Sequence, residues 1–536
     1  MADEAATLLD DIARLKAMLA ERDSEIASQK VTIRDLAGKL LWAEEKYKVM
    51  ELRYFGRKSE RYNPEDDRQN RLFDEAELHA DGTAFPVREA ITVPEHERKR
   101  AGRKAKSDAL PVREEIHELP ADDRRCLCCG EDRPIIGEDR TSEYDLVPAH
   151  VVKVVHVRRK YGPCACEDFR MSGAPTVLSA PGPAKVVPGS DFTNRTIAFF
   201  LTAKYADAIP FYRMERMLVR SGLVVSRAGL CNIAVSAGRA IAPVIDLMNA
   251  DLAGSSALLM DETMVQVLKD GRGPPGRKSY FWVVRGHAAG GKPILRFAYH
   301  ANRSGSFADT LLGGFSGYLQ TDGYSGYDHL EGRSDIVLVG CFAHMRRKFV
   351  SAWETAGKTG MAGEAIGRIA AIYQIESELR ALLDQGRLAE PDFIAKRREM
   401  LQPLFDGFRE WLLGAGLVVA PQSQLGKAVA YAQGMLNRAI RFVEHPLLTP
   451  DTNKVENAIR PFVVGRKNWL FSGSPLGAHA SAGLYSLIET AKANGHDPYG
   501  YLCHLFDHLP KCVDESEIRT LLPYNLDPST TRQNAE

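Results

Sequence analysis

A series of strand-like segments between residues 256 and 341 limits what this chain can fold into. Apolar runs occur at 257–260 with a continuation at 265–269, and at 280–285, 294–299, 317–320 and 336–339. Runs of this length, bounded by glycine-rich turns, are typical of buried strands. A helix is expected at 306–312, between the third and fourth strands. The segment therefore predicts a mixed sheet rather than a helical bundle.

The order of these elements predicts a particular topology. Three strands, a helix, a strand, a helix and a strand form the order of a ribonuclease-H-like fold, in which the first and fourth strands lie side by side. Asp261 lies where the first strand is expected to end and Asp322 where the fourth is expected to end, so folding should bring them together. A block of helical composition at 345–445 comes next, and we interpret it as an all-helical insertion in the catalytic domain.

A third carboxylate, Glu456, lies where a helix is expected to begin, beyond the insertion. Clustered carboxylates repel one another unless cations compensate them. Their oxygens are the ligands that Mg²⁺ prefers, and Mn²⁺ is an alternative. Two such ions can stabilise the attacking and leaving oxygens of a phosphodiester displacement. The pattern predicts an enzyme that cleaves or transfers nucleic-acid strands.

Chain length and composition indicate the number of domains, the source of any affinity for DNA and the cellular location. The chain has 536 residues, which predicts three or four domains. Its 70 basic and 70 acidic side chains cancel, so affinity for DNA must arise from local clusters such as the basic stretch 98–106, although a soluble linker has the same composition. No apolar run of membrane-spanning length occurs and the N-terminus is acidic. We expect a cytoplasmic protein with no membrane partner, associated with the nucleoid when bound to DNA.

The first fifty residues carry a heptad pattern that predicts a coiled coil and a homo-oligomer. A long amphipathic helix packed on its own protein is the alternative. The first seam is uninterrupted, whereas polar or small residues interrupt the second. The seams consist of Ile12, Leu19, Ile26, Ile33 and Leu40, and of Leu8, Leu15, Leu36 and Met50.

Two cysteine pairs flank a strand-like, valine-rich segment. Cys126 and Cys129 form the first pair, and Cys164 and Cys166 the second. Four thiolates in such a module are what a tetrahedral Zn²⁺ site requires. The second pair has one spacer residue, and Cys128 is a rival ligand in the first pair. We favour zinc over free thiols.

Residues 195–245 are expected to be helical. A turn at Ser221-Gly222 separates two helices, and Ser226 can cap the second. This pattern permits a helix-turn-helix with Arg227 facing DNA, and an ordinary helical hairpin has the same appearance.

Several motifs in this order resemble the large acidic-triad transposase of the insertion sequence 66 family. They are Phe55-Gly56-Arg57-Lys58-Ser59-Glu60, the cysteine pairs, Asp261-Glu262-Thr263, Thr321-Asp322-Gly323-Tyr324, the segment Cys341 to Phe349, and the segment Asn453 to Pro461. The resemblance implies that Asp261, Asp322 and Glu456 bind catalytic metal ions. It also implies attack on phosphodiester bonds first by water and then by a 3'-hydroxyl, without a covalent protein–DNA intermediate. The implied partners are element ends, target DNA and accessory proteins of the same element.

Cations near the triad are candidates for DNA contact. Arg460 lies one helical turn after Glu456, and Arg466 and Lys467 follow beside Trp469. A charged helix face with a buried tryptophan is the alternative. Arg346, Arg347 and Lys348 similarly suit phosphate contact, although a solvated surface run would have the same appearance.

Other acidic and metal-ligating side chains are interpreted as bystanders. Strand alternation should turn Glu262 away from the face of Asp261, and Asp328 lies well beyond its strand. His344 with Cys341 offers too few ligands for a metal, so hydrogen bonding beside the site is favoured.

The sequence thus predicts a multidomain chain of mixed α and α/β structure. A ribonuclease-H-like structure-specific nuclease and a catalytically inactive DNA-binding regulator are the competing interpretations of function. The expected units are a coiled-coil helix (1–54), a basic flexible linker (55–115), a zinc-binding module (116–175), a helical DNA-binding region (190–250), the first part of the catalytic core (255–344), the helical insertion (345–445), the last part of the core (446–495) and a helical tail (496–536).

Overall fold

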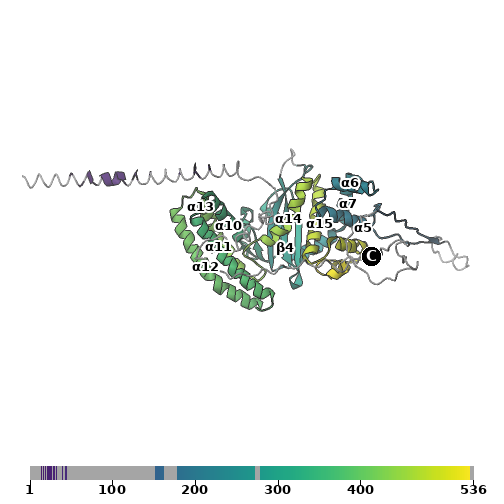
Figure 1. Cartoon of the computed structure of the whole chain (residues 1–536). Coiled ribbons are helices and arrows are strands. Elements are labelled where there is room, and N and C mark those ends of the chain that lie inside the picture. The colour runs from purple at the N-terminus through teal and green to yellow at the C-terminus, as the bar shows by residue number, and fades with distance from the viewer. Residues whose placement is uncertain are drawn as a thin grey trace, which may run out of the picture.

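The structure is a computed structural model, and it describes residues 151–161, 178–271 and 278–531 together with scattered positions between Arg14 and Tyr47 (Figure 1). Those scattered positions are helical. Among them, Leu19 and Ile26 of the first heptad seam are exposed. The remaining seam residues, the basic linker and all four candidate zinc-binding cysteines lie outside the described residues.

A five-stranded mixed sheet forms the centre of the fold. Its strand order is β5-β4-β3-β6-β7, with β3, β4 and β5 antiparallel and with β6 parallel to both β3 and β7. The expected neighbourhood of the first and fourth strands is present, because β3 pairs with β6. The strands are β3 (Ala257–Gln266), β4 (Lys278–His287), β5 (Pro293–His300), β6 (Gly317–Gln320) and β7 (Ile336–Val339).

Asp261 lies inside its strand, and the expectation that the strand ends there is wrong. The antiparallel pairing of β3 with β4 continues to Gln266, whereas the parallel pairing with β6 stops at Leu259. The strand persists because β4 still satisfies its backbone groups on one side. Beyond Leu259 the other side of β3 is left unpaired by β6, and the site lies there.

Helices cover the two faces of the sheet. On one face α14 (Asn453–Trp469) and α15 (Pro475–Ala493) pack through aromatic contacts such as Phe281 with Phe462, whose ring centroids are 4.6 Å apart. The opposite face carries Trp282, whose ring meets Phe307 of α9. Three elements cover that face: α8 (Ala242–Ala253), α9 (Gly305–Leu312) and the 3-10 helix η3 (Ser325–Leu330).

The block at 345–445 is occupied by helices that begin directly after β7 and extend away from the sheet (Figure 1). They enclose a core of their own, which includes Phe342, Phe405 and Phe408. A buried ion pair from Arg397 to Glu376 ties two of these helices together. The helices are α10 (Phe342–Thr355), α11 (Met361–Asp384), α12 (Glu390–Val418), α13 (Gln424–Ala439) and the 3-10 helix η4 (Ile440–Glu444).

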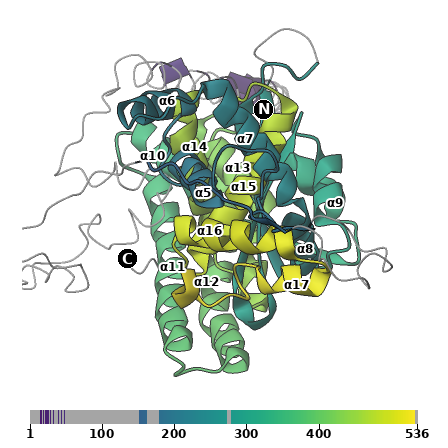
Figure 2. The same cartoon turned by 90° about the vertical axis from the view of Figure 1, so that its right-hand side faces the viewer.

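The segment before the sheet and the C-terminal tail are also helical and lie on the α15 side (Figure 2). Within the described residues no single helix is long and apolar enough to span a membrane, and the bent pair α7–α8 meets those criteria only when taken together. The elements are β1 (Lys160–Tyr161), β2 (Leu178–Ser179), α5 (Asn194–Tyr205), α6 (Phe211–Arg220), α7 (Arg227–Ala240), η2 (Ala289–Gly291), α16 (Pro498–His508), η5 (Leu509–Lys511), α17 (Glu515–Thr520) and η6 (Pro528–Thr531).

Candidate active site

Strand register brings Asp261 and Asp322 to matching positions. Leu259 of β3 is paired with Gln320 of β6; Asp261 lies two residues further along β3, and Asp322 lies two residues beyond the end of β6. Because side chains alternate between the faces of a sheet, residues at matching positions point to the same face. The first two acidic residues of the predicted triad are therefore brought together by pairing between β3 and β6.

Glu456 approaches the same face from the covering helix α14. Asp261 is the cross-strand partner of Val283, which shares its face with Phe281, and Phe281 packs on Phe462 of α14. Glu456 lies in the first turn of that helix and is 8% exposed. The hydroxyl of Thr452 donates to its Oε1 at 3.1 Å.

The charges of Asp322 and Glu456 affect the pKa of Asp261. Burial raises the pKa of Asp261 well above its usual range, and the nearby charges of Glu262, Asp322 and Glu456 raise the pKa further. A hydrogen bond from the backbone N–H of Glu262, at 2.7 Å, opposes this rise. At neutral pH an ionised Asp261 is consequently in an unfavourable environment, which a proton or a metal cation would relieve.

The loop after β6 fixes the backbone around Asp322. The backbone N–H of Tyr324 donates to Asp322 Oδ1 at 2.8 Å, and the hydroxyl of Tyr431 in α13 donates to the Asp322 carbonyl at 2.9 Å. Gly323 between them has a φ of 83°, and a Cβ there would lie 2.8 Å from that hydroxyl. Glycine is thus required for two reasons, backbone conformation and the close approach of α13.

Glu262 points to the opposite face of the sheet from Asp261. Its cross-strand partner is Trp282, which packs on the face covered by α9 and η3. The Glu262 side chain is 1% exposed, accepts a 2.6 Å hydrogen bond from the hydroxyl of Tyr327 and pairs with Arg303. Burial raises the pKa of Glu262, and both partners oppose that rise.

Three basic side chains lie against the acids. Arg303 pairs with Glu262 and also reaches Asp322, with Nη2 3.8 Å from Oδ2. On the other side, Arg347 Nη2 lies 3.6 Å from Glu456 Oε2, and His344 Nδ1 lies 3.8 Å from Glu456 Oε1.

Asp328, the second bystander acid, is paired with Arg438 of α13 at 2.7 Å.

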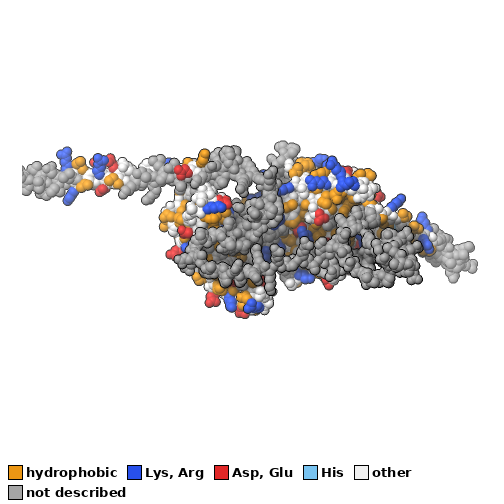
Figure 3. Space-filling model, in the orientation of Figure 1, with side chains coloured by type: hydrophobic (Ala, Val, Ile, Leu, Met, Phe, Trp, Pro, Cys, Tyr) orange, Lys and Arg blue, Asp and Glu red, His pale blue; other side chains and the backbone are white. Residues whose placement is uncertain are grey.

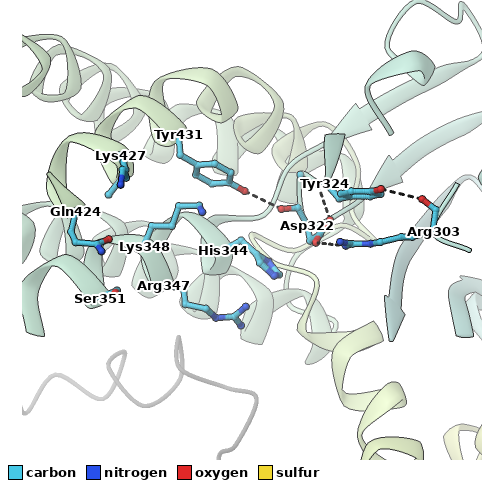
Figure 4. Close-up of a pocket in the computed structure, with 12 residues that line it drawn as sticks. Arg303, Asp322, Tyr324, His344, Arg347, Lys348, Ser351, Gln424, Lys427 and Tyr431 are labelled. Atoms are coloured by element: carbon cyan, nitrogen blue, oxygen red, sulfur yellow. Dashed lines mark hydrogen bonds and ion pairs between the residues drawn. The ribbon is translucent and has the colours of Figure 1, made fainter. Parts of the chain in front are cut away.

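A pocket of about 490 Å³ opens between the end of β6 and the helical insertion (Figure 4). Asp322 and Arg303 line its sheet side. Its opposite wall is formed by one face of α10 and one face of α13, with four side chains in each face at helical spacing. These are His344, Arg347, Lys348 and Ser351 from α10, and Gln424, Lys427, Ala428 and Tyr431 from α13.

Aromatic rings hold two of the pocket's cations. The guanidinium of Arg303 lies 3.6 Å from the centroid of the Tyr324 ring, and Lys348 Nζ lies 4.4 Å from the centroid of Tyr431. Such contacts orient a cation without neutralising its charge. Lys348 and Lys427 extend toward the pocket in the close-up view (Figure 4).

Within the described ranges, no three His, Cys, Asp or Glu side chains are grouped closely enough to hold a metal ion. Asp322 and Glu456 instead contact the basic side chains described above. The donor set nevertheless fits a hard divalent cation, because all three candidate ligands are carboxylates and Asp261 is buried among negative charges.

A family model described as "Transposase IS66 family" matches residues 189–480, which contain all three carboxylates. The chain belongs to the IS66 transposase family. A second model, the IS66 C-terminal element, matches 486–524, and a third, "Transposase C of IS166 homeodomain", matches 42–116.

Three curated relatives of this transposase come from Sinorhizobium fredii (strain NBRC 101917 / NGR234), and all are described as uncharacterized. The protein y4qI is 29% identical, with 98% of each chain covered. The protein y4jD is also 29% identical, over 76% of this chain and 79% of its own. The protein y4hP is 27% identical over 80% and 77%, respectively.

The structure gives the basic residues predicted for DNA contact in the transposase different environments. Arg347 lines the pocket, whereas Arg346 is 2% exposed and faces the interior of the insertion. Arg466 donates to the Met264 carbonyl, an interaction that anchors the end of β3. Lys467 is exposed and Arg460 is half-buried, both on α14.

The sequence patterns did not identify several residues of the pocket. Arg303, Lys427 and Tyr431 are far from any acidic motif, and no local pattern marks them. The stripe formed by His344, Arg347, Lys348 and Ser351 does carry a signal, since polar residues recur there at helical spacing on a helix whose other face is apolar.

Proposed function

We propose that this transposase binds the ends of a mobile element and catalyses metal-dependent phosphodiester hydrolysis followed by strand transfer. The observation that carries the proposal is the arrangement of three acidic residues beside a basic pocket. Asp261 and Asp322 are aligned by register, and Glu456 comes from the helix on the same face. Family membership gives the reaction class.

Asp261, Asp322 and Glu456 are the residues that would hold Mg²⁺ or Mn²⁺. When bound, the ions would lower the pKa of an attacking water or hydroxyl and stabilise charge on the leaving oxygen. Asp261 must lose its proton for this to occur, and its raised pKa makes that loss dependent on pH. The sheet topology supports a ribonuclease-H-like core as the framework.

The basic side chains have a separate task in this proposal. Arg347, Lys348 and Lys427 line the pocket opposite Asp322 and are suited to bind the phosphates of the strand to be cut. Arg303, held between Glu262 and Asp322, keeps the Asp322 carboxylate in one orientation. Glu262 then acts as a positioning residue through Arg303.

The remaining modules are proposed on sequence grounds. The N-terminal heptads would join two or more copies, which transposition needs because two element ends must be held together. The four cysteines would hold Zn²⁺ in a DNA-contacting module. The basic segment at 98–106 and the match at 42–116 support further contacts with DNA.

The test is a joining assay on duplex DNA that carries the inverted repeats flanking the gene. With Mg²⁺, the parent should produce nicked ends and then products joined to a target plasmid. Asp261→Asn, Asp322→Asn and Glu456→Gln should each lower both products by at least about 100-fold, because loss of even an indirect ligand contact costs 10- to 100-fold. End binding should persist.

Asp328→Asn is the matched control, since this acid lies near the site in sequence but pairs with Arg438. It should cut and join like the parent. Nicks without joined products would contradict strand transfer and favour a structure-specific nuclease. Full activity in any of the three triad variants would remove that residue from the site.

A further inference from the structure

Helix α6 presents a row of arginines to solvent. Its inner side buries Met214 and Leu218, while Arg213, Arg216 and Arg220 are exposed on the outer side. Spacings of three and four residues place the three arginines on one face, over a length of about 10 Å. Basic side chains gather over this part of the molecule in the space-filling view (Figure 3).

The turn after α6 adds a fourth arginine to this surface. Gly222, with a φ of 81°, lets the chain reverse, and α7 begins at the exposed Arg227. The backbone N–H of Arg227 donates to Glu215 Oε1 at 3.0 Å, which fixes the start of α7 against α6. Among the described residues, none of the four guanidinium groups lies in an ion pair with a carboxylate, so their charge is uncompensated there.

Helix α6 is joined to the end of the helix that carries Glu456. The ammonium of Lys204 lies 4.5 Å from the ring centroid of Phe211 and 4.2 Å from that of Trp469. Phe211 begins α6 and Trp469 ends α14. Next to this contact, the amide of Asn468 donates to the Ala208 carbonyl at 3.0 Å. The arginine face and the site are therefore parts of one packed unit.

Helix α14 runs from the site to this contact with α6. From Glu456 to Trp469 the helix advances 13 residues, which at about 1.5 Å per residue is roughly 20 Å. Successive base pairs are about 3.4 Å apart, so this separation corresponds to about six base pairs of duplex.

We propose that the outer face of α6 and the start of α7 bind the phosphate backbone of duplex DNA about six or more base pairs from the cleavage site. The position relative to cleavage rests on the proposed function, whereas the binding itself does not. Uncompensated arginines in a row match the charge of a phosphodiester strand. The contact would set how far the duplex enters the active site.

The test compares full-length protein with the triple variant Arg213→Ala/Arg216→Ala/Arg220→Ala, using fluorescence anisotropy on a random-sequence duplex of about 30 base pairs. The plot of log affinity against log salt should become shallower by about 0.9 for each lost phosphate contact. The three side chains are exposed, so folding should be preserved. A second variant with lysine at the same positions should keep most of the slope.

The matched control removes three exposed basic side chains from helices or loops of the insertion that do not line the pocket, Arg368, Arg387 and Lys396. It should leave the slope unchanged. In the joining assay, the α6 variant should raise the DNA concentration at half-maximal rate and leave the rate at saturation unchanged.

An α6 alanine variant with the parent's salt slope would overturn the inference, because the arginines would then make no contact with phosphates. A parent that binds the duplex but neither cuts nor joins would contradict the proposed function. The salt slopes would still decide the inference in that case.

Discussion

The two walls of the pocket differ in charge and in origin. The sheet wall supplies Asp322, with Asp261 beside it, and the cation on this wall, Arg303, is paired with Glu262 and Asp322. The wall from the insertion supplies cations, which include Lys348 and Lys427. We infer that one wall serves the chemistry and the other serves the binding of the strand.

The walls also differ in how they are built. Pairing between two parallel strands aligns the aspartates, so their juxtaposition depends on the sheet alone. The cations come from α10 and α13, whose faces meet only when the insertion has packed. Mutations on the sheet wall should therefore affect turnover, whereas mutations on the insertion wall should affect affinity.

Glu262→Gln gives the largest effect outside the triad. It removes the charge that holds Arg303, although the amide can still accept from Tyr327. Loss of a group that orients a metal ligand typically costs about 10- to 100-fold in metal affinity or activity. We expect the Mg²⁺ concentration for half-maximal cleavage to rise, measured in the joining assay over a Mg²⁺ series.

Glu262→Asp is the control for this prediction, because it keeps the charge and should recover part of the loss. An unchanged Mg²⁺ requirement in Glu262→Gln would show that Arg303 does not depend on Glu262. The two walls would then be less distinct than the geometry indicates.

Lys348→Ala and Lys427→Ala should weaken DNA binding rather than turnover, because both lysines belong to the insertion wall. Each removes one cation from the insertion wall, so the salt dependence of DNA binding should become shallower by about 0.9 per lysine that contacts a phosphate. The rate at saturating DNA should change little. A fall in that rate with unchanged DNA affinity would assign these lysines to the chemistry instead.

Asp261→Asn should be more stable than the parent at neutral pH in EDTA. Because the folded-state pKa of Asp261 is raised, its ionisation destabilises the folded chain. That cost is absent below the unfolded pKa of about 4, grows as pH rises towards the folded-state pKa, and is constant above it. The stability difference, measured by urea unfolding, should shrink as pH is lowered from 8 to about 5.

Mg²⁺ provides the second half of this test. It should raise the melting temperature of the parent more than that of Asp261→Asn, since a ligand that binds only the folded state stabilises it. A parent that is more stable than the variant in EDTA would contradict the electrostatic account.

Much of the sheet could be predicted from apolar runs along the chain, and the order of the elements predicted the alignment of the two acids. Alternation also predicted the orientation of Glu262, which points to the face of Trp282. The persistence of β3 through Asp261 was not predicted, because polar residues interrupt the apolar run there while pairing with the next strand, β4, continues. The apolar content of a segment does not show where its pairing with a neighbouring strand ends.

Contacts between side chains from distant segments were also not predicted, because no local sequence pattern marks them. Arg303 was not identified, because its role depends on Glu262 and Asp322 lying on either side of it. Arg346 and Arg347 are adjacent and equally basic, yet helical geometry buries one and directs the other to the pocket. Composition alone cannot separate such neighbours.

The central claim is that Asp261, Asp322 and Glu456 jointly bind divalent cations. Titration of Mn²⁺ into the protein, with free Mn²⁺ read by electron paramagnetic resonance, tests it most directly. We expect the parent to take up a pair of ions, and we expect Asp261→Asn, Asp322→Asn and Glu456→Gln each to take up fewer, whereas Asp328→Asn matches the parent. Equal uptake by the parent and all three triad variants would contradict the account.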